Sequence, residues 1–170
     1  MIGNDVVDLT LAKTESNWQR KGFLNKIFTE NEKILIQKSQ NQELMVWNLW
    51  SRKEAAYKIW NRQTGIRKYN PVQFECFDLG FDVGKVRFKE TVYNTKTEIS
   101  ENFIHTIAVV NDEDFAKVKF LKSDSKIKKQ QNLPYFLDTK NNIVILSKSH
   151  HGSFERIIYL VKYKIKFIFL

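Results

Sequence analysis

The sequence predicts an α+β fold, because helical patterns come early in the chain and strand patterns come late. Two segments with helical periodicity and capping residues lie between residues 29 and 61, and short apolar or alternating segments follow Pro71. Helices followed by strands are typical of α+β proteins rather than of a repeating βαβ fold. The chain has 170 residues, 42% of them hydrophobic, which predicts one domain with a sizeable core.

The N-terminal half is predicted to contain one strand and two helices. Residues 2–11 are short, apolar and partly alternating, as in a strand. Thr29 is expected to begin a helix as its N-cap, with Glu32 three residues later completing a capping box. A second helix is predicted from about Asn41 to Asn61, before Gly65, because glycine is the residue that most often ends a helix.

The part of the chain after Pro71 is predicted to consist mainly of strands. One segment alternates apolar and basic side chains, and another is a dense apolar run that suits a central strand. The last segment ends in an alternation that places its lysines on one face. The predicted strands are 72–77, 86–89, 103–110, 143–146 and 157–170.

Several features exclude whole classes of protein. The single cysteine, Cys76, excludes an intramolecular disulfide framework and a cysteine-based zinc site. The N-terminus has no basic segment followed by a long apolar one, so no secretory signal is expected. The apolar tract 157–170 is interrupted by lysines and is too short to span a bilayer. We therefore expect a cytoplasmic protein with no membrane association.

Positive charge is concentrated in the last third of the chain. The net charge is +9, and residues 121–170 hold ten basic and three acidic side chains, a net of +7. Such a balance suits a polyanionic or acidic partner, whether a nucleic acid, a phosphorylated small molecule or an acidic protein surface. A solubilising surface is an equally good explanation of the charge alone.

The predicted helix 41–61 carries a polar stripe on an otherwise apolar surface. Apolar side chains point in nearly all directions around it, as in a buried helix. Ser51, Glu54, Lys58 and Asn61 nevertheless share one narrow face, on which Glu54 and Lys58 are close enough to pair. An ordinary solvated face with a weak ion pair is one interpretation, and a binding site is the other. Arg52, Lys53 and Arg62 point elsewhere and predict a second polar surface.

Two further clusters carry groups that are suited to phosphate chemistry. Asp5 and Asp8 lie in or beside the first strand, and Gly3 permits the close approach of a ligand or another strand. Residues 147–152 (SKSHHG) follow an apolar run, at an expected strand-to-turn junction, and supply donors for phosphate oxygens. When each cluster is taken alone, an exposed strand edge and a simple hairpin turn are the commoner explanations. Together, two carboxylates, a lysine and a Ser/His turn suit Mg²⁺ and a pyrophosphate.

The three clusters, in this order, resemble the 4′-phosphopantetheinyl transferase superfamily. Residues 3–9 (GNDVVDL) resemble its opening G-x-D-[IV]-V-E-[IL], and residues 50–58 (WSRKEAAYK) resemble its helix [FW]-[ST]-x-K-E-[AS]-x-x-K. Residues 28–32 (FTENE) are similar to its F-T-x-x-E helix start, and residues 147–150 (SKSH) to its late S-x-[ST]-H segment. The layout resembles the small, single-repeat, holo-acyl-carrier-protein synthase branch, which usually has Glu where this chain has Asp8.

This resemblance implies a fold, a reaction and a site. The fold is a long helix packed on an antiparallel sheet, in one domain over residues 1–170 with a possible insertion at 122–142. The reaction moves the phosphopantetheine arm of coenzyme A to a serine of a carrier protein, with Mg²⁺ as cofactor. Asp5 and Glu54 would hold the metal, Lys58 would contact the phosphates and stabilise charge on the leaving adenosine bisphosphate, and Ser149 and His150 would bind phosphate from the opposite side. The base that deprotonates the carrier serine is not identified, and Glu54 or a metal-bound water is a candidate.

The resemblance also implies partners. An acidic acyl or peptidyl carrier protein would match the basic C-terminal third. It serves fatty-acid, polyketide or peptide synthesis; we expect fatty acid biosynthesis, although the sequence does not choose among them. A homo-oligomer is expected, with a trimer first, because single-repeat members assemble their site between subunits.

Two alternatives stay open. One is a homologue that binds coenzyme A or a carrier protein without catalysis, which the shortened Asp8 and the short Gly65 turn keep in play. The other is a basic nucleic-acid-binding domain, which we expect least, since the chain carries no nucleic-acid-binding motif. Cys76 and His105 are expected to be buried structural residues, and His151 either flanks the phosphates or lies exposed on the turn.

Overall fold

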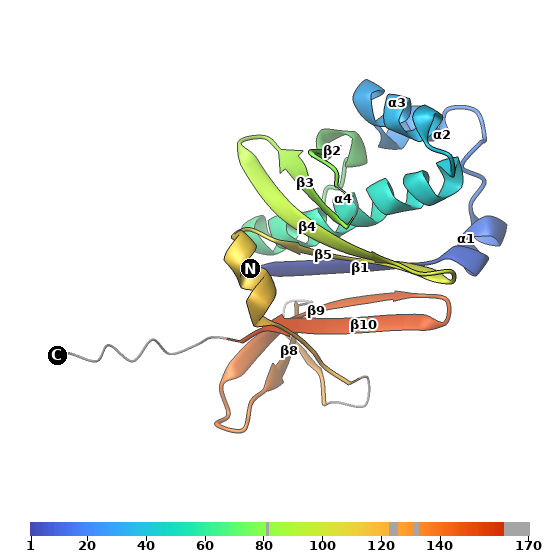
Figure 1. Cartoon of the computed structure of the whole chain (residues 1–170). Helices are drawn as coiled ribbons and strands as arrows, with labels where there is room; N and C mark the ends of the chain where they lie inside the picture. Colours follow the sequence, from blue (N-terminus) through green and yellow to red (C-terminus); the bar gives the residue numbers. More distant parts are fainter. Residues whose placement is uncertain (81, 123–125, 131–132, 162–170) are drawn as a thin grey trace.

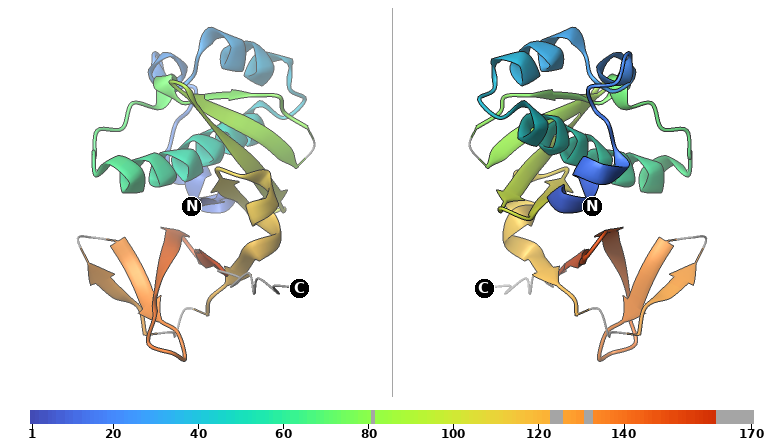
Figure 2. Two further views of the ribbon diagram at one scale, coloured as in Figure 1. Left: turned by 90° about the vertical axis from the view of Figure 1, so that its left-hand side faces the viewer. Right: turned by 90° about the vertical axis from the view of Figure 1, so that its right-hand side faces the viewer.

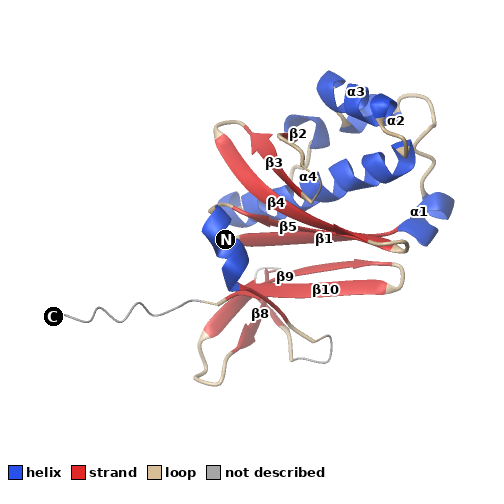
Figure 3. Ribbon diagram, viewed as in Figure 1, coloured by secondary structure: helices blue, strands red, loops and turns tan. Residues whose placement is uncertain are grey.

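The computed structural model describes residues 1–80, 82–122, 126–130 and 133–161. It confirms the α+β class: the strands form two antiparallel five-stranded sheets, and the helices gather on one side of the first sheet (Figures 1 and 3). The strand order is β1-β5-β4-β3-β2 in the first sheet and β6-β10-β9-β8-β7 in the second. The first sheet and its helices hold the candidate site, and the second sheet packs beneath them (Figure 2).

The helices and the strands of the first sheet come from the N-terminal two thirds of the chain, and the strands of the second sheet come from the rest. The helices are α1 (Leu9–Glu15), α2 (Phe23–Ile27), α3 (Glu30–Lys38), α4 (Gln42–Thr64) and the short 3-10 helices η1 (Pro71–Gln73) and η2 (Asp112–Lys117). The strands of the first sheet are β1 (Ile2–Asp8), β2 (Glu75–Phe77), β3 (Val83–Phe88), β4 (Thr91–Ile99) and β5 (Phe103–Val109). The strands of the second sheet are β6 (Val118–Phe120), β7 (Lys128–Gln130), β8 (Leu133–Leu137), β9 (Ile143–His151) and β10 (Phe154–Leu160).

The two helices predicted from capping residues are confirmed. Thr29 and Glu32 form the reciprocal capping box at the start of α3. Asn41 caps α4 through its side-chain oxygen, which accepts a hydrogen bond from the Leu44 amide at 3.0 Å. Gly65 ends α4 in the left-handed region, at φ 72°. Helix ends are set by contacts over three or four residues, so the sequence alone predicts them well.

The first strand is shorter than predicted, because Asp8 begins a helix. Its carboxylate accepts hydrogen bonds from the amides of Thr10 and Leu11, each at 3.0 Å, and α1 starts at the next residue. The prediction of a strand through Leu11 is therefore wrong at its end. Aspartate is also a common N-cap residue, and in this structure Asp8 caps α1 instead of continuing the strand.

Strand β4 was not predicted, because polar residues occupy its buried face. Thr95 and Thr97 are buried, and their hydroxyls are paired with Arg52 and Thr106. The pattern of apolar residues alone does not detect such a strand. Strand β9 continues to His151, so the cluster 147–151 lies in a strand and only Gly152 and Ser153 form the turn. Of the predicted strand 157–170, residues 162–170 lie outside the described part of the chain.

Helix α4 packs on one face of the first sheet and forms the core with it. Its buried apolar side chains and those of the strands form one hydrophobic cluster. This cluster includes aromatic side chains from the segment between η1 and β3. Phe74 and Phe88 stack there with ring centroids 4.3 Å apart, and Cys76 is buried beside them, as expected. The α4 members of this cluster are Val46, Trp47, Leu49, Ala55, Ala56 and Ile59. None of the described helices has the length and apolar character needed to cross a membrane.

Gly3 sets the distance between β1 and α4. A Cβ atom at this position would lie 2.0 Å from the Ala55 carbonyl oxygen and 3.1 Å from the Ile59 side chain. The close approach predicted at Gly3 is thus made by a helix, rather than by a ligand or a strand. Because Asp5 is on the same face of β1 two residues later, this approach also decides how near Asp5 lies to α4.

We expect Gly3→Ala to destabilise the protein by about 1–3 kcal/mol, because the added methyl group must displace α4 backbone. The measurement is the free energy of unfolding in urea. Gly80→Ala is the matched control: its Cβ would meet a methyl group of the exposed Val83 side chain at 3.0 Å and backbone only at 3.9 Å. Equal stability of the two variants would contradict the interpretation of Gly3 as the contact point.

Candidate active site at the edge of β1

Three of the predicted site residues converge where α4 crosses β1. Asp5 comes from β1, and Glu54 and Lys58 come from successive turns of α4. The Lys58 ammonium donates to the Asp5 carboxylate at 3.2 Å and to the Asn4 carbonyl oxygen at 2.7 Å. The side chains of Asp5 and Lys58 are 14% and 26% exposed, so the pair is reachable from solvent without being surrounded by it.

Ser51 and Lys58 of the polar stripe on α4 face β1, whereas Asn61 donates to the Ile66 carbonyl oxygen beyond the helix end. Ser51 is fully buried and donates to the Asp5 carbonyl oxygen at 3.4 Å. Lys58 pairs with Asp5 across the interface between the two elements, rather than with Glu54 along the helix. The stripe therefore holds the edge of β1 and leaves the Glu54 carboxylate directed to the same region.

The electrostatics of the site disfavour two unneutralised carboxylates. Burial, and then the charge of Asp5, raise the pKa of Glu54 to about 7, with Lys58 opposing them. Burial also raises the pKa of Asp5, again opposed by Lys58. Lys58 thus places one ammonium group beside the two carboxylates. When Asp5 and Glu54 are both ionised, the three groups together carry a net charge of −1.

This donor set fits a divalent cation. A positive ion placed between the two carboxylates would stabilise their ionised forms, which burial and the charge of Asp5 on Glu54 disfavour. Among the described residues, no group of three or more His, Cys, Asp or Glu side chains is arranged to hold a metal. An ion at Asp5 and Glu54 would therefore keep positions for water and for substrate oxygens, as Mg²⁺ characteristically does.

Aromatic side chains form the wall of the site next to Glu54. Tyr69 packs against Tyr57 and Trp50, with ring centroids 4.3 and 6.0 Å apart. Burial raises the pKa of both tyrosines, and the charge of Glu54 raises each further. Among the described residues the buried Tyr69 hydroxyl has no hydrogen-bond partner. The wall lowers the local dielectric around Glu54, which strengthens any charge interaction made there.

Ser149 and His150 do not join this cluster within one chain. They are neighbours on β9, so their side chains point to opposite faces of the second sheet. Ser149 is buried against β1, where its hydroxyl accepts a hydrogen bond from the side-chain amide of Asn4 at 2.9 Å. His150 is exposed and points away from β1. The Ser149 hydroxyl contacts Asn4 in this chain, and the phosphate contacts of Ser149 and His150 stay predictions.

Asp8 and His151 join the second sheet to the first. Besides capping α1, the Asp8 carboxylate accepts from the Ser153 amide at 3.0 Å in the β9–β10 turn. The Asp8 amide donates to His151 Nδ1 at 2.9 Å. These contacts and the cap hydrogen bonds lower the pKa of Asp8, the Ser153 contact most. Asp8 therefore has a structural role here, since its carboxylate joins the start of α1 to the β9–β10 turn.

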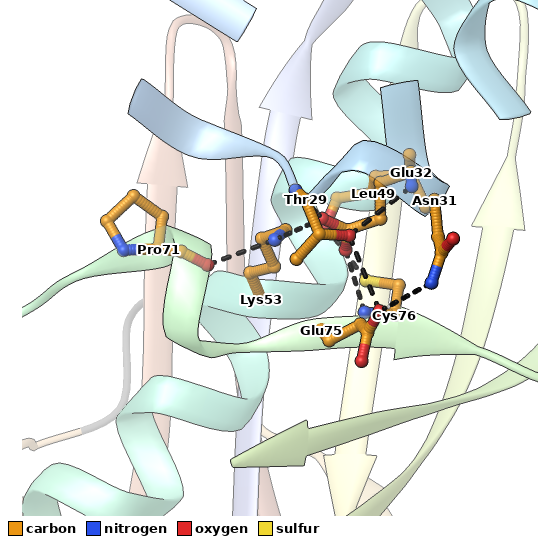
Figure 4. Close-up of polar contacts among 8 residues, drawn as sticks. All are labelled: Thr29, Asn31, Glu32, Leu49, Lys53, Pro71, Glu75 and Cys76. Atoms are coloured by element: carbon orange, nitrogen blue, oxygen red, sulfur yellow. Dashed lines mark hydrogen bonds and ion pairs between the residues drawn. The ribbon is translucent and has the colours of Figure 1, made fainter. Parts of the chain in front are cut away.

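Arg52 and Lys53 do not form the second polar surface expected from their positions on the helix. Both are fully buried. Lys53 forms an ion pair with Glu32 at 2.7 Å and donates to the Pro71 carbonyl oxygen at 3.0 Å (Figure 4). Arg52 donates to the Thr95 hydroxyl at 2.6 Å. A helix that is apolar on most sides buries its charged residues too, and they then need partners on other elements.

The comparison with protein families decides what this site belongs to. Residues 1–116 match the family model of the 4′-phosphopantetheinyl transferase superfamily. The chain belongs to this superfamily. A curated relative, the holo-[acyl-carrier-protein] synthase of Fusobacterium nucleatum subsp. nucleatum, is 30% identical over 117 residues, which are 68% of this chain and 91% of that protein. The enzyme class is accordingly a phosphopantetheinyl transferase of the holo-acyl-carrier-protein synthase type.

Solved structures of such synthases share the fold of this transferase. The Helicobacter pylori enzyme, in complex with coenzyme A, has a TM-score of 0.53 at 17% identity, over 65% of this chain and 100% of that one. The Neisseria meningitidis enzyme has a TM-score of 0.52 at 16% identity, over 65% and 97%. The family match ends at residue 116, just before β6, so the whole second sheet lies beyond it.

The most important residue that the sequence did not single out is Asn4. It lies inside the recognised motif and is fully buried, with its side chain on the face of β1 opposite Asp5. Strand alternation does place Asn4 and Asp5 on opposite faces, but only the structure shows that the second sheet covers the Asn4 face.

Proposed function

We propose that this transferase moves the 4′-phosphopantetheine arm of coenzyme A to a serine hydroxyl of an apo carrier protein, with Mg²⁺ as cofactor. The observation that carries the proposal is the convergence of Asp5, Glu54 and Lys58 within the segment that matches the family. The relative from Fusobacterium nucleatum is named for action on an acyl carrier protein, and the Helicobacter pylori structure contains coenzyme A.

The proposed reaction is a displacement at phosphorus. The serine oxygen bonds to the phosphorus that bears the pantetheine arm, the bridging P–O bond breaks, and adenosine bisphosphate leaves with the electron pair. The serine proton must pass to a base, for which Glu54 and a water held by the metal are the two candidates. A bound Mg²⁺ would offset charge on the pyrophosphate.

The residues of the chain have separate tasks in this proposal. Asp5 and Glu54 are the groups that would hold the metal. Lys58 keeps the Asp5 carboxylate in place and presents positive charge to the phosphates from the same point. The basic second sheet suits an acidic carrier surface, because long-range attraction raises the rate of encounter.

We propose further that the enzyme is a homo-oligomer, with a trimer as the first expectation. The exposed His150 faces away from its own site. This placement supports a site completed by another copy, and an active monomer in sedimentation would contradict this.

The function is tested by the intact mass of an apo acyl carrier protein after incubation with this enzyme, coenzyme A and Mg²⁺. We expect a gain of one phosphopantetheine group, and no gain when EDTA removes the metal. Binding of coenzyme A without any gain, across several carrier proteins, would instead support a non-catalytic homologue.

A further inference from the structure

The open edge of β1 is covered by side chains instead of another strand. On one side, Lys58 and Arg62 of α4 donate to the carbonyl oxygens of Asn4 and Ile2, at 2.7 and 2.6 Å. On the other side, β9 supplies acceptors for the strand amides: Ser147 Oγ accepts from the Asn4 amide at 2.9 Å. Because the backbone groups at this edge bond to side chains of α4 and β9, these two elements hold β1 in position.

Asn4 is fixed at both its backbone and its side chain. Its Nδ2 group donates to Ser149 Oγ at 2.9 Å and to the Arg156 carbonyl oxygen at 3.1 Å. It also contacts His105 Nε2 at 3.2 Å. Burial lowers the pKa of His105 to about 4, so the ring that lies beside Asn4 is neutral at neutral pH. The β9–β10 hairpin therefore holds Asn4 through three hydrogen bonds, to the hydroxyls of Ser147 and Ser149 and to the Arg156 carbonyl oxygen.

Asp5 is the next residue, and its carboxylate emerges on the other face of β1. The Asn4 backbone is held on both sides, because its amide donates to Ser147 of β9 and its carbonyl oxygen accepts from Lys58 of α4, which also contacts the Asp5 carboxylate. A shift of β1 relative to α4 would change the distance between Asp5 and Glu54. Figure 1 shows β9 and β10 beside β1, and the hydrogen bonds of this hairpin to Asn4 restrain such a shift.

We propose that the β9–β10 hairpin, which lies outside the family match, positions Asp5 for the metal through Ser147, Ser149 and Asn4. Ser147 and Ser149 are positioning residues, since they touch Asn4 and not the reacting groups. This inference rests on the proposed cation site at Asp5 and Glu54. Outer partners that orient a metal ligand typically change metal affinity about 10–100-fold when they are removed.

The test measures binding of Mn²⁺ alone to the purified protein, by the electron paramagnetic resonance signal of the free ion, together with thermal unfolding. We expect Ser147→Ala/Ser149→Ala to weaken Mn²⁺ binding by about tenfold or more. We expect Ser149→Thr, which keeps the hydroxyl, to bind Mn²⁺ within about twofold of the parent. The matched control is Lys148→Gln, on the opposite face of the same strand, where Lys148 pairs with Glu155.

The single variant Ser149→Ala keeps the proposal testable if the double variant fails to fold. Asn4 then keeps its contacts with Arg156 and His105, so the chain is expected to fold, and a smaller loss of Mn²⁺ affinity should remain. Folded serine variants that bind Mn²⁺ as the parent does would overturn the positioning role, even if they melt earlier. A parent protein that binds no Mn²⁺ would overturn the cation site itself, and the positioning role with it.

Discussion

Replacing Glu54 by Gln should abolish phosphopantetheine transfer and, in cation-free buffer, make the protein more stable. Gln keeps the shape of the side chain but removes the charge that holds the cation and can accept the serine proton. Losing a group that acts directly at the charged centre is expected to lower kcat by about 10²–10³-fold. The stability gain follows from the raised pKa of Glu54, which reports that the folded state disfavours its charged form.

The gain should depend on pH in a defined direction. The pKa of Glu54 is about 7 in the folded protein against an ordinary value of 4.5, so folding favours the protonated form. The parent therefore loses stability as pH rises from about 4.5 through 7, and the glutamine of the Glu54→Gln variant does not titrate. Above pH 7 the variant should be more stable by about 1–3 kcal/mol, after allowing for solvent screening at a partly exposed group. At pH 4 the two proteins should be equal.

The measurement is urea unfolding at pH 4 and pH 8, paired with the carrier-protein mass assay. Glu43→Gln, at the other end of α4, is the control and should change neither quantity appreciably. Adding Mg²⁺ should stabilise the parent and not Glu54→Gln, since only the parent retains both carboxylates. A variant that is less stable at pH 8, or that still transfers the arm at the parent's rate, would contradict the assignment.

Replacing Lys53 by Met should produce the largest loss of stability, about 3–5 kcal/mol. The Lys53–Glu32 pair has no exposed side-chain surface at either partner. Glu32 also accepts from the amides of Thr29 and Cys76, at 2.8 and 2.7 Å, and so joins α3 to β2 (Figure 4). Met fills the volume but leaves a buried carboxylate without its positive partner, which is the costly outcome for a buried pair.

Urea unfolding of the variant measures this loss, and Lys33→Met is the matched control. The Lys33–Glu30 pair has a similar length of 2.6 Å, but Glu30 is 86% exposed. Its loss should change stability by no more than about 0.5–1 kcal/mol. Glu32→Gln/Lys53→Met should lose less than Lys53→Met alone, because it removes both charges. Similar losses at the buried and the exposed pair would contradict this explanation.

The sequence determined those features that depend on near neighbours in the chain. The two ends of α4 and the capping box of α3 were predicted from residues within a few positions of each other. The resemblance to the transferase family rested on short motifs and was confirmed by the family match. Asp5, Glu54 and Lys58 were named from those motifs, and the structure brings the three together.

The tertiary structure decided what each charged residue contacts. Lys58 was expected beside Glu54, one turn away, yet it pairs with Asp5 on another element. Lys53 was expected at a surface and is buried against Glu32. Ser149, whose contact with phosphate stays a prediction, accepts a hydrogen bond from the side-chain amide of Asn4, far away in the chain. Such partners depend on which face of α4 meets the sheet and on how the second sheet packs along β1. Local periodicity carries no information on these contacts, because they join residues that only folding brings together.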